Sequence, residues 1–390
     1  MVLASLETYG ITADRGFLCE FDAPAVQLSG ALGEVRDVAM RLPEILPTGQ
    51  VRSVLDALPT VPAEAIAELT DAQARMAMVH YSFMVQAYVW GTDVPTQTLP
   101  PSLAAPMVAL ADRLGQQPLL QYSGYVLDNW GLLDPTKGVS LDNIYMIQKF
   151  AAGTDEAWFV LVHVAIEARA GEALALFAPL ISAVADGDAD RARDILRRIV
   201  AVWADINPIF DRMPEQCDPY IYFRRVRPYI HGWKDNPALN GGIVYEGVDR
   251  FEGMPQSFRG QTGSQSSIVP SMDALLGIGH AADPLRAYLD ELHIYRPPAQ
   301  RRFIDDVRAQ SQLRAFVSRE SNKTLTEAYN AAVRAVADFR SRHLEYAASY
   351  INKQGSHAAG NDTEIGTGGT PFMKYLKKHR DETRANLIPE

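Results

Sequence analysis

Residues 324–351 read TLTEAYNAAVRAVADFRSRHLEYAASYI, and this stretch decides the expected fold class. Apolar and aromatic residues recur at every third or fourth position, so they share one face of a long amphipathic helix. Thr324 followed by Glu327 has the spacing of a capping box, which predicts that the helix begins there. A single histidine, His343, lies on the apolar face, with Arg340 one turn before it.

An imidazole on the apolar face of a rigid helix has two interpretations. The commoner one is a core histidine that satisfies its hydrogen bonds within the protein. The other is an axial heme ligand, in which a neutral ring nitrogen binds the iron while nearby arginines pair with the propionates. The helix pattern alone leaves both interpretations open.

Length and composition limit the classes of protein to consider. The chain has 390 residues, 47% of them hydrophobic, enough for one large or two smaller domains. Its net charge of −10 disfavours nucleic-acid binding. Two cysteines make no disulfide framework, no secretory signal is evident, and the longest apolar run, residues 157–166, is too short to cross a bilayer. We therefore expect a cytoplasmic protein with no membrane or nucleic-acid partner.

Helical periodicity recurs along most of the chain, whereas the alternation typical of strands is scarce. We expect a mainly α fold, with a smaller, mostly helical domain in residues 1–140 and a large all-helical domain in residues 141–390. The turn-rich stretch 133–140 sets this boundary. The expected helices span residues 30–41, 71–89, 101–114, 143–149, 155–183, 188–212, 219–232, 271–277, 283–292, 297–310, 324–351 and 371–386.

Two long segments lack periodicity. Residues 234–269 are rich in Gly, Pro, Gln and Ser, which predicts a long ordered loop with a functional role. Residues 352–370, reading NKQGSHAAGNDTEIGTGGT, follow the His343 helix and predict either a mobile lid over a site or a solvated linker. No P-loop, dinucleotide fingerprint, HExxH motif or nucleophile elbow occurs, so hydrolase and zinc chemistry lack support.

Two further segments place polar residues in apolar or aromatic surroundings. Residues 158–167, WFVLVHVAIE, contain His163, which is either a hydrogen-bonded core histidine or a histidine of a binding pocket opposite His343. Residues 222–237, YFRRVRPYIHGWKDNP, contain Arg227, which belongs either to a solvated basic face or to a clamp for a carboxylate.

Taken in order, these and several other segments resemble the indoleamine 2,3-dioxygenase family of heme proteins. The resemblance covers nearly the whole chain. The matching segments are YGIT (9–12), RGFL (15–18), LP (42–43), MVQAYVW (84–90), LPPSLAAP (99–106), YSGYVLDNW (122–130), GWKDNP (232–237), GIVYEG (242–247), SQSS (264–267), DALLGI (273–278), YRPPAQ (295–300), RSRH (340–343) and GTGGT (366–370).

The resemblance implies a heme b cofactor and assigns roles to individual residues. His343 is implied as the proximal iron ligand, Arg340 as the propionate-side arginine with Asp273 near it, and Arg227 as the partner of the substrate carboxylate. The implied pocket residues are Phe159, Tyr122 and Tyr125 around the indole, Tyr222 and Phe223 beside Arg227, Gly263 and Ser264 in the loop over the heme, and Thr367 in the mobile loop.

Three residues depart from the vertebrate pattern of the family. His163 replaces a serine there, and the related tryptophan 2,3-dioxygenases have a histidine at the equivalent place. We expect His163 to act in catalysis by accepting or orienting the indole N–H. Tyr222 and Tyr125 also differ, which makes the pocket more polar and leaves the range of substrates open.

The implied reaction inserts O2 across the indole C2=C3 bond of L-tryptophan or a related indoleamine and gives N-formylkynurenine, the first step of kynurenine-type tryptophan catabolism. An electron donor is expected to keep the heme ferrous, and the protein is expected to be a monomer. Two alternatives stay open. One is a heme-dependent monooxygenase of a substituted indole in secondary metabolism, and the other is a non-catalytic heme-binding sensor.

Overall fold

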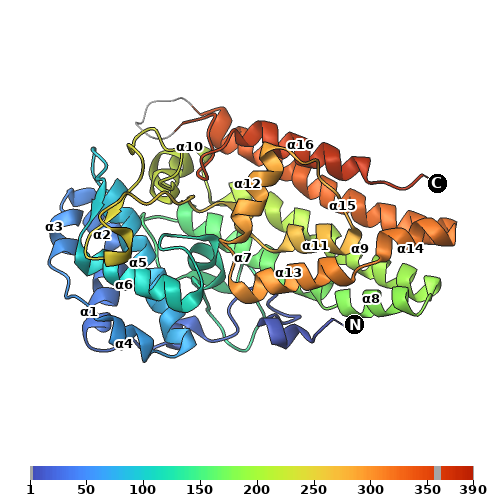
Figure 1. Ribbon diagram of the computed structural model, residues 1–390, viewed down its shortest axis with the longest axis horizontal. Helices are drawn as coiled ribbons and strands as arrows, with labels where there is room; N and C mark the ends of the chain where they lie inside the picture. The colour runs from blue at the N-terminus through green and yellow to red at the C-terminus, as the bar shows by residue number, and fades with distance from the viewer. Residues whose placement is uncertain (1–2, 355–361, 390) are drawn as a thin grey trace.

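The computed structural model describes residues 3–354 and 362–389, and helices dominate them (Figure 1). This confirms the mainly α fold expected from the sequence. The α-helices are α1 Ala31–Met40, α2 Leu42–Ile45, α3 Val51–Asp56, α4 Ala63–Ala67, α5 Asp71–Trp90, α6 Pro101–Leu114, α7 Asp155–Leu174, α8 Phe177–Ala185, α9 Ala189–Asp211, α10 Pro219–Ile221, α11 Ile268–Leu276, α12 Pro284–His293, α13 Pro298–Gln310, α14 Leu313–Glu320, α15 Lys323–Ala347 and α16 Phe372–Ala385. Short strands form two pairs: β1 Thr98–Leu99 is parallel to β4 Val244–Tyr245, and β2 Trp130–Leu132 is antiparallel to β3 Ile144–Met146.

The long helix α15 packs between α9 and α16. Its buried side chains, among them Leu325, Tyr329, Val333 and Val336, follow the spacing of three or four that the sequence showed. The aromatic ring of Phe339 stands 5.7 Å from that of Trp203 on α9, nearly perpendicular to it. This packing fixes the axial rotation of α15 and so the direction in which its C-terminal turns point.

Helix α7 is buried on nearly every side and lies against α9. The N-terminal segment crosses it at Gly171. A β-carbon added at Gly171 would stand 2.6 Å from the backbone nitrogen of Gly16 and 2.7 Å from the carbonyl oxygen of Ala13. Only a glycine in α7 allows two backbones to approach this closely.

The N-terminal helices α1 to α6 gather at one end of the molecule, and α8 and α14 lie at the other (Figure 1). The first residues do not join α1 to α6, because the hydroxyl of Tyr9 donates to Asp306 of α13 at 2.7 Å. The turn-rich stretch 133–140 lies in the loop between β2 and β3. The division into domains at residue 140 stays a prediction.

Most expected helices are confirmed within a few residues, but the predicted start of the helix over residues 324–351 is wrong. Asn322, not Thr324, caps α15, because its side-chain oxygen accepts from the backbone N–H of Leu325 at 3.2 Å. Thr324 lies inside the first turn, where its hydroxyl donates to Asn322 at 3.0 Å. Helix α14 was not expected from the sequence.

Three other expected helices differ from the structure. Residues 144–146 form strand β3, since Ile144 and Met146 are buried while Tyr145 between them is exposed, which is the period of a strand. The helix expected over 155–183 is two helices, because Pro179 has no N–H to continue a single helix and instead stands in the first turn of α8. The helix expected over 219–232 breaks into α10, a π-helical turn and a 3-10 turn that begins at Arg227 beside Pro228.

The predicted ordered loop over 234–269 is confirmed up to the start of α11, with only β4 and short 3-10 turns within it. The predicted mobile segment 352–370 lies partly outside the described residues, which resume at residue 362.

The close crossing at Gly171 leads to a stability prediction. Gly171→Ala should lower the free energy of unfolding by about 1–3 kcal/mol, because the methyl group meets backbone atoms that cannot rotate away. Helix propensity alone would favour alanine by up to about 1 kcal/mol, so the sign of the change is diagnostic. Urea unfolding measures it, with Gly138→Ala, which meets no atom within 4 Å, as the control. A stabilised Gly171→Ala variant would contradict the crossing.

Candidate functional site

Two adjoining cavities lie among α7, α11, α12, α15 and α16. The larger has a volume of about 610 Å³ and the smaller a volume of about 130 Å³. They share a wall that contains His163 of α7, Gly263 and Ser264 of the loop before α11, and His343 of α15. The larger volume falls in the range of sites that bind cofactors and small molecules. Segments that the sequence singled out separately therefore meet at one place.

His343 stands in the last turns of α15 and lines both cavities. Within residues 3–354 and 362–389, no group hydrogen-bonds to either nitrogen of its ring. Burial, and then the neighbouring His163 and Arg340, lower the pKa of this imidazole to about 4. The ring is therefore neutral at physiological pH and keeps a lone pair for a ligand.

His163 belongs to the shared wall and is held in one orientation. Its Nδ1 lies 2.7 Å from the backbone carbonyl oxygen of Phe159, so Nδ1 carries the hydrogen and donates it. Burial lowers the pKa of His163, which keeps the ring neutral. Its Nε2 is therefore an acceptor at the edge of the cavities, suited to an N–H donor.

The predicted neighbours Arg340 and Asp273 form a two-pronged ion pair. Nη2 and Nη1 of Arg340 lie 2.6 Å and 3.1 Å from the two carboxylate oxygens of Asp273, and Nη1 also donates to Thr383. His280 stands 3.2 Å from the same carboxylate. Burial opposes ionisation of Asp273, but Arg340 and His280 outweigh it and hold the pKa of that carboxyl well below its usual range. Both members of the pair line the larger cavity.

Aromatic side chains wall the smaller cavity. The ring of Phe159 lies 4.6 Å from that of Tyr222, which in turn lies 5.8 Å from that of Tyr350. Among the described residues, none hydrogen-bonds to the Tyr222 hydroxyl. Burial raises the pKa of this phenol, so the hydroxyl is neutral and offers one hydrogen to a bound molecule.

Residues 362–370, the second of the two described parts of the predicted lid 352–370, are packed against the site. The hydroxyl of Thr367 donates to the carbonyl oxygen of Gln261 at 2.6 Å, and Thr367 lines the smaller cavity. A β-carbon added at Gly260 would stand 2.2 Å from the backbone nitrogen of Gly232 and 2.6 Å from the carbonyl oxygen of Thr367. Three backbone segments therefore make direct contact beside this cavity, which glycine at positions 232 and 260 allows.

Three residues implied for the substrate pocket do not line either cavity. Tyr125 is fully buried one layer behind Phe159, and its hydroxyl donates to Glu156 at 3.4 Å. Arg227 is also fully buried, and its Nη2 donates to the carbonyl oxygen of Ile365 at 2.6 Å. Phe223 lies beneath the Arg227 guanidinium, with its ring centre 5.5 Å away. Burial lowers the pKa of Arg227 to about 10, so the group stays charged.

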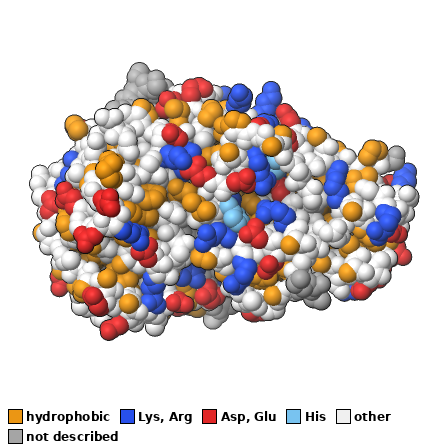
Figure 2. All heavy atoms as spheres, viewed as in Figure 1, with side chains coloured by type: hydrophobic (Ala, Val, Ile, Leu, Met, Phe, Trp, Pro, Cys, Tyr) orange, Lys and Arg blue, Asp and Glu red, His pale blue; other side chains and the backbone are white. Residues whose placement is uncertain are grey.

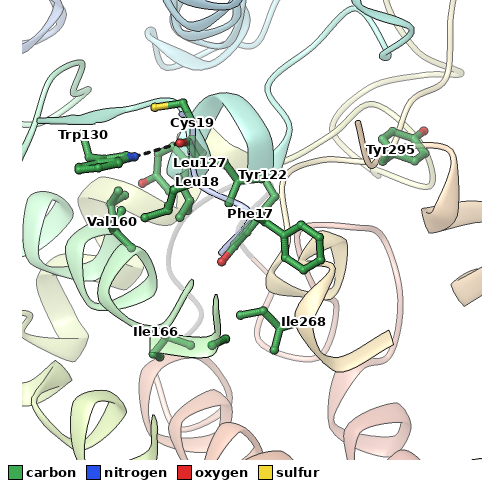
Figure 3. Packing of buried hydrophobic residues seen from close by; sticks show 14 of the residues in the cluster. Phe17, Leu18, Cys19, Tyr122, Leu127, Trp130, Val160, Ile166, Ile268 and Tyr295 are labelled. Atoms are coloured by element: carbon green, nitrogen blue, oxygen red, sulfur yellow. Dashed lines mark hydrogen bonds between the residues drawn. The ribbon is translucent and has the colours of Figure 1, made fainter. Parts of the chain in front are cut away.

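Sequence reasoning missed a carboxyl group at the wall of the larger cavity. Glu167 is fully buried one helical turn after His163, and it accepts hydrogen bonds from the Tyr122 hydroxyl at 2.9 Å and the Ser266 hydroxyl at 2.8 Å. Burial raises its pKa to about 7. Figure 3 shows Tyr122 pointing toward Ile166 of α7 and Ile268 of α11, which line the same cavity. The spacing of four residues between His163 and Glu167 could have indicated that both side chains lie on the same face of the helix.

Irregular helical turns lie next to the site. A π-helical turn, Ser123–Leu127, follows Tyr122; a second, Tyr222–Val226, leads into Arg227; and a third, Ala348–Asn352, follows the His343 helix. A π-helical turn inserts an extra residue and redirects the side chains around it, and such turns are frequent at functional sites. The sequence patterns did not predict these π-helical turns.

These features define a class of protein. A neutral, unpartnered imidazole beside a cavity with apolar walls and buried guanidinium groups fits a heme with an axial histidine and two carboxylates. The second, neutral histidine and the aromatic side pocket fit a flat, N–H-bearing substrate. The fold and the site suit a helical heme-dependent oxidoreductase.

Known proteins match this chain along nearly its whole length. The sequence profile of the indoleamine 2,3-dioxygenase family matches residues 5–386. Indoleamine 2,3-dioxygenase 1 of Rattus norvegicus is 34% identical, with 98% of this chain and 96% of the rat protein covered. Indoleamine 2,3-dioxygenase of Saccharomyces cerevisiae is 30% identical, with 98% and 94% covered.

The chain belongs to the indoleamine 2,3-dioxygenase family. It is an enzyme, a dioxygenase of the heme-dependent class, and the resemblance drawn from the sequence segments is confirmed. Within the described parts of the chain, no helix has both the length and the apolar character required to span a bilayer.

The raised pKa of Glu167 leads to a pH prediction. The folded protein keeps this proton up to about pH 7, whereas the unfolded chain releases it near the ordinary value of 4.5. The carboxyl therefore stabilises the fold at acid pH and loses that contribution as pH rises from 4.5 to 7, by on the order of 3 kcal/mol. Glu167→Gln should remove this decline in urea unfolding measured across that range. Glu172→Gln, on an exposed position of the same helix, is the control; parallel profiles for Glu167→Gln and the wild type would contradict the assignment.

Proposed function

We propose that this enzyme holds heme b through His343 and uses O2 to open the indole ring of L-tryptophan or a related indoleamine, giving N-formylkynurenine. The observation that carries the proposal is the neutral His343 imidazole, which lines both cavities and has no hydrogen-bond partner among the described residues. The ring is half-buried and faces the cavities, so a nitrogen without a partner within the described chain is available to a ligand there. Bound there, ferrous heme supplies the activation of O2 that the ring-opening reaction needs.

The chain's own residues supply binding, orientation and exclusion of water. Phe159 and Tyr222 form an aromatic wall that suits an indole ring lying in the smaller cavity. The Nε2 acceptor of His163 would take the indole N–H and set the direction of the C2=C3 bond. His163 needs no proton for this task, which agrees with its lowered pKa.

Arg227 is proposed to bind the substrate carboxylate. Its buried guanidinium keeps its charge and already holds the carbonyl oxygen of Ile365, in the segment that also contains Thr367. A carboxylate near this segment would form a stronger, charge-assisted hydrogen bond than a backbone carbonyl does. Substrate binding and the position of residues 362–370 would then be coupled through one side chain.

Further parts of the proposal rest on the family resemblance. They are an electron donor that keeps the heme ferrous, a monomeric enzyme, a cytoplasmic location and a role as the first step of kynurenine-type tryptophan catabolism. Tyr125 and Phe223 would act from behind the pocket wall, by fixing Phe159 and Arg227.

The cofactor assignment is tested by removing the imidazole. His343→Ala should abolish the Soret band of histidine-ligated heme in the purified protein, because the neutral His343 ring lines both cavities and has no hydrogen-bond partner among the described residues. His379 of α16 also lines both cavities with a neutral imidazole whose Nε2 has no hydrogen-bond partner among the described residues, so His379→Ala is the matched comparison and should keep the band. His293→Ala, at the mouth of the larger cavity and paired with Asp305, should keep the band. A normal spectrum of His343→Ala would sink the assignment.

The carboxylate assignment is tested by kinetics. Arg227→Ala should raise KM for L-tryptophan by about tenfold or more, the loss expected for a charge-assisted contact, with a smaller effect on kcat. Tryptamine, which lacks the carboxylate, should be turned over by the wild type and the variant with similar KM values. An Arg227→Ala variant with wild-type KM for L-tryptophan would remove Arg227 from the site.

A further inference from the structure

Two buried guanidinium groups line the larger cavity. Arg340 is 7% exposed and Arg296, which follows α12, is 3% exposed. The charge of Arg340 is matched, because both oxygens of Asp273 accept from it. Its interaction with the protein is therefore nearly complete before any ligand arrives.

Arg296 has no such partner. Its Nη2 donates to the carbonyl oxygen of Ser264 at 2.7 Å and its Nε to that of Ser266 at 3.3 Å, both in the loop that borders the two cavities. Of the residues that the structure describes, none accepts from Nη1 and no carboxylate pairs with this guanidinium. Carbonyl oxygens orient the cation but do not neutralise it.

The other charges of the cavity do not supply the missing anion. At the exposed mouth, Arg286 pairs with Asp290 at 2.8 Å, and Arg308 pairs with Asp305 at the same distance. Inside, burial raises the pKa of Glu167 to about 7, so this carboxyl keeps its proton through the mildly acid range and does not act as a fixed anion. Figure 2 shows Lys and Arg side chains, with Asp and Glu side chains among them, around a histidine in the middle of the face that it draws. Among the described residues that line the interior of the cavity, Arg296 is therefore a cation without a carboxylate paired to it.

We propose that Arg296 binds a carboxylate of the cofactor in the larger cavity and is the main source of the protein's selectivity for the free heme dicarboxylate. This inference rests on the proposed function, since it takes the carboxylates to be those of the heme held by His343. A buried, unmatched cation is unfavourable in the absence of a ligand and favours an anion strongly when one is present. Arg340 then acts mainly through its pair with Asp273, which fixes α11 against α15.

This role of Arg296 was not predicted from the sequence. Arg296 lies in YRPPAQ, a segment that was used only for the family resemblance. Its capacity to bind a carboxylate depends on the absence of a paired acidic side chain, which is a property of the folded chain. The loop carbonyls of Ser264 and Ser266 come from residues more than one helix earlier in the chain.

The test compares hemin with hemin dimethyl ester, in which both propionates are uncharged, by Soret titration of the heme-free full-length chain. The wild type should bind hemin more tightly than the ester. Arg296→Gln should weaken hemin binding by about tenfold to a hundredfold and change ester binding little, as expected for loss of a charge-assisted hydrogen bond. Arg308→Gln, which changes an exposed arginine at the mouth of the same cavity, should behave as the wild type.

Several outcomes would overturn the proposal. They are a wild type that does not distinguish hemin from its ester, an Arg296→Gln variant with unchanged hemin affinity, and an equal loss for hemin and ester, which would indicate a structural role. If circular dichroism shows that Arg296→Gln does not fold, Arg296→Lys provides the test. Because lysine keeps the positive charge, this variant should retain most of the preference for hemin over the ester. Loss of that preference in Arg296→Lys would contradict the proposal. The proposed function is judged separately by the His343-dependent Soret band, which Arg296→Gln should retain once heme is bound.

Discussion

The site depends on a half-buried histidine ring, His343, that has no hydrogen-bond partner among the described residues. Helix α15 is packed between α9 and α16, which keeps His343 away from bulk water and beside the cation of Arg340. Protonation would place a second positive charge next to that cation, so the ring stays neutral. The same burial that costs solvation free energy therefore preserves the lone pair that a heme iron requires.

Around this ring, the chain separates charge from aromatic surface. The larger cavity has the buried arginines and their partners, while the smaller has Phe159 and Tyr222. The two regions meet at His163, whose bond to the Phe159 carbonyl fixes it as an acceptor. The backbone contacts among Gly232, Gly260 and Thr367 bring three distant segments to one edge of the smaller cavity. The proposed dicarboxylate cofactor and flat substrate would thus have separate, adjoining environments.

Much of this could be predicted from the sequence, because it follows from local rules. The helical periodicity of residues 324–351 placed His343 and Arg340 one turn apart, and the ion pair of Arg340 with Asp273 agrees with the resemblance. The errors were also local: Asn322 competes successfully with Thr324 for the cap, and the short run at Ile144–Met146 has too few residues to distinguish a strand from a helix.

The protonation and hydrogen bonding of each polar group after packing could not be predicted from the sequence. Glu167 and His163 are neighbours on one helix, and only burial by the rest of the chain explains their states: it raises the pKa of the Glu167 carboxyl, which holds its proton, and lowers the pKa of the His163 imidazole, which stays a neutral acceptor. Arg227 and Arg296 are both buried arginines, and their surroundings differ only through contacts with distant loops. Such properties are set by tertiary contacts rather than by spacing.

The most direct test of the account is single-turnover oxidation of L-tryptophan by the reduced, heme-loaded enzyme under isotopically labelled O2, with product analysis by mass spectrometry. The account predicts N-formylkynurenine that contains both labelled oxygen atoms of one O2 molecule. A product with a single labelled oxygen and an intact indole ring, or a heme-loaded enzyme that oxidises no indole, would contradict it.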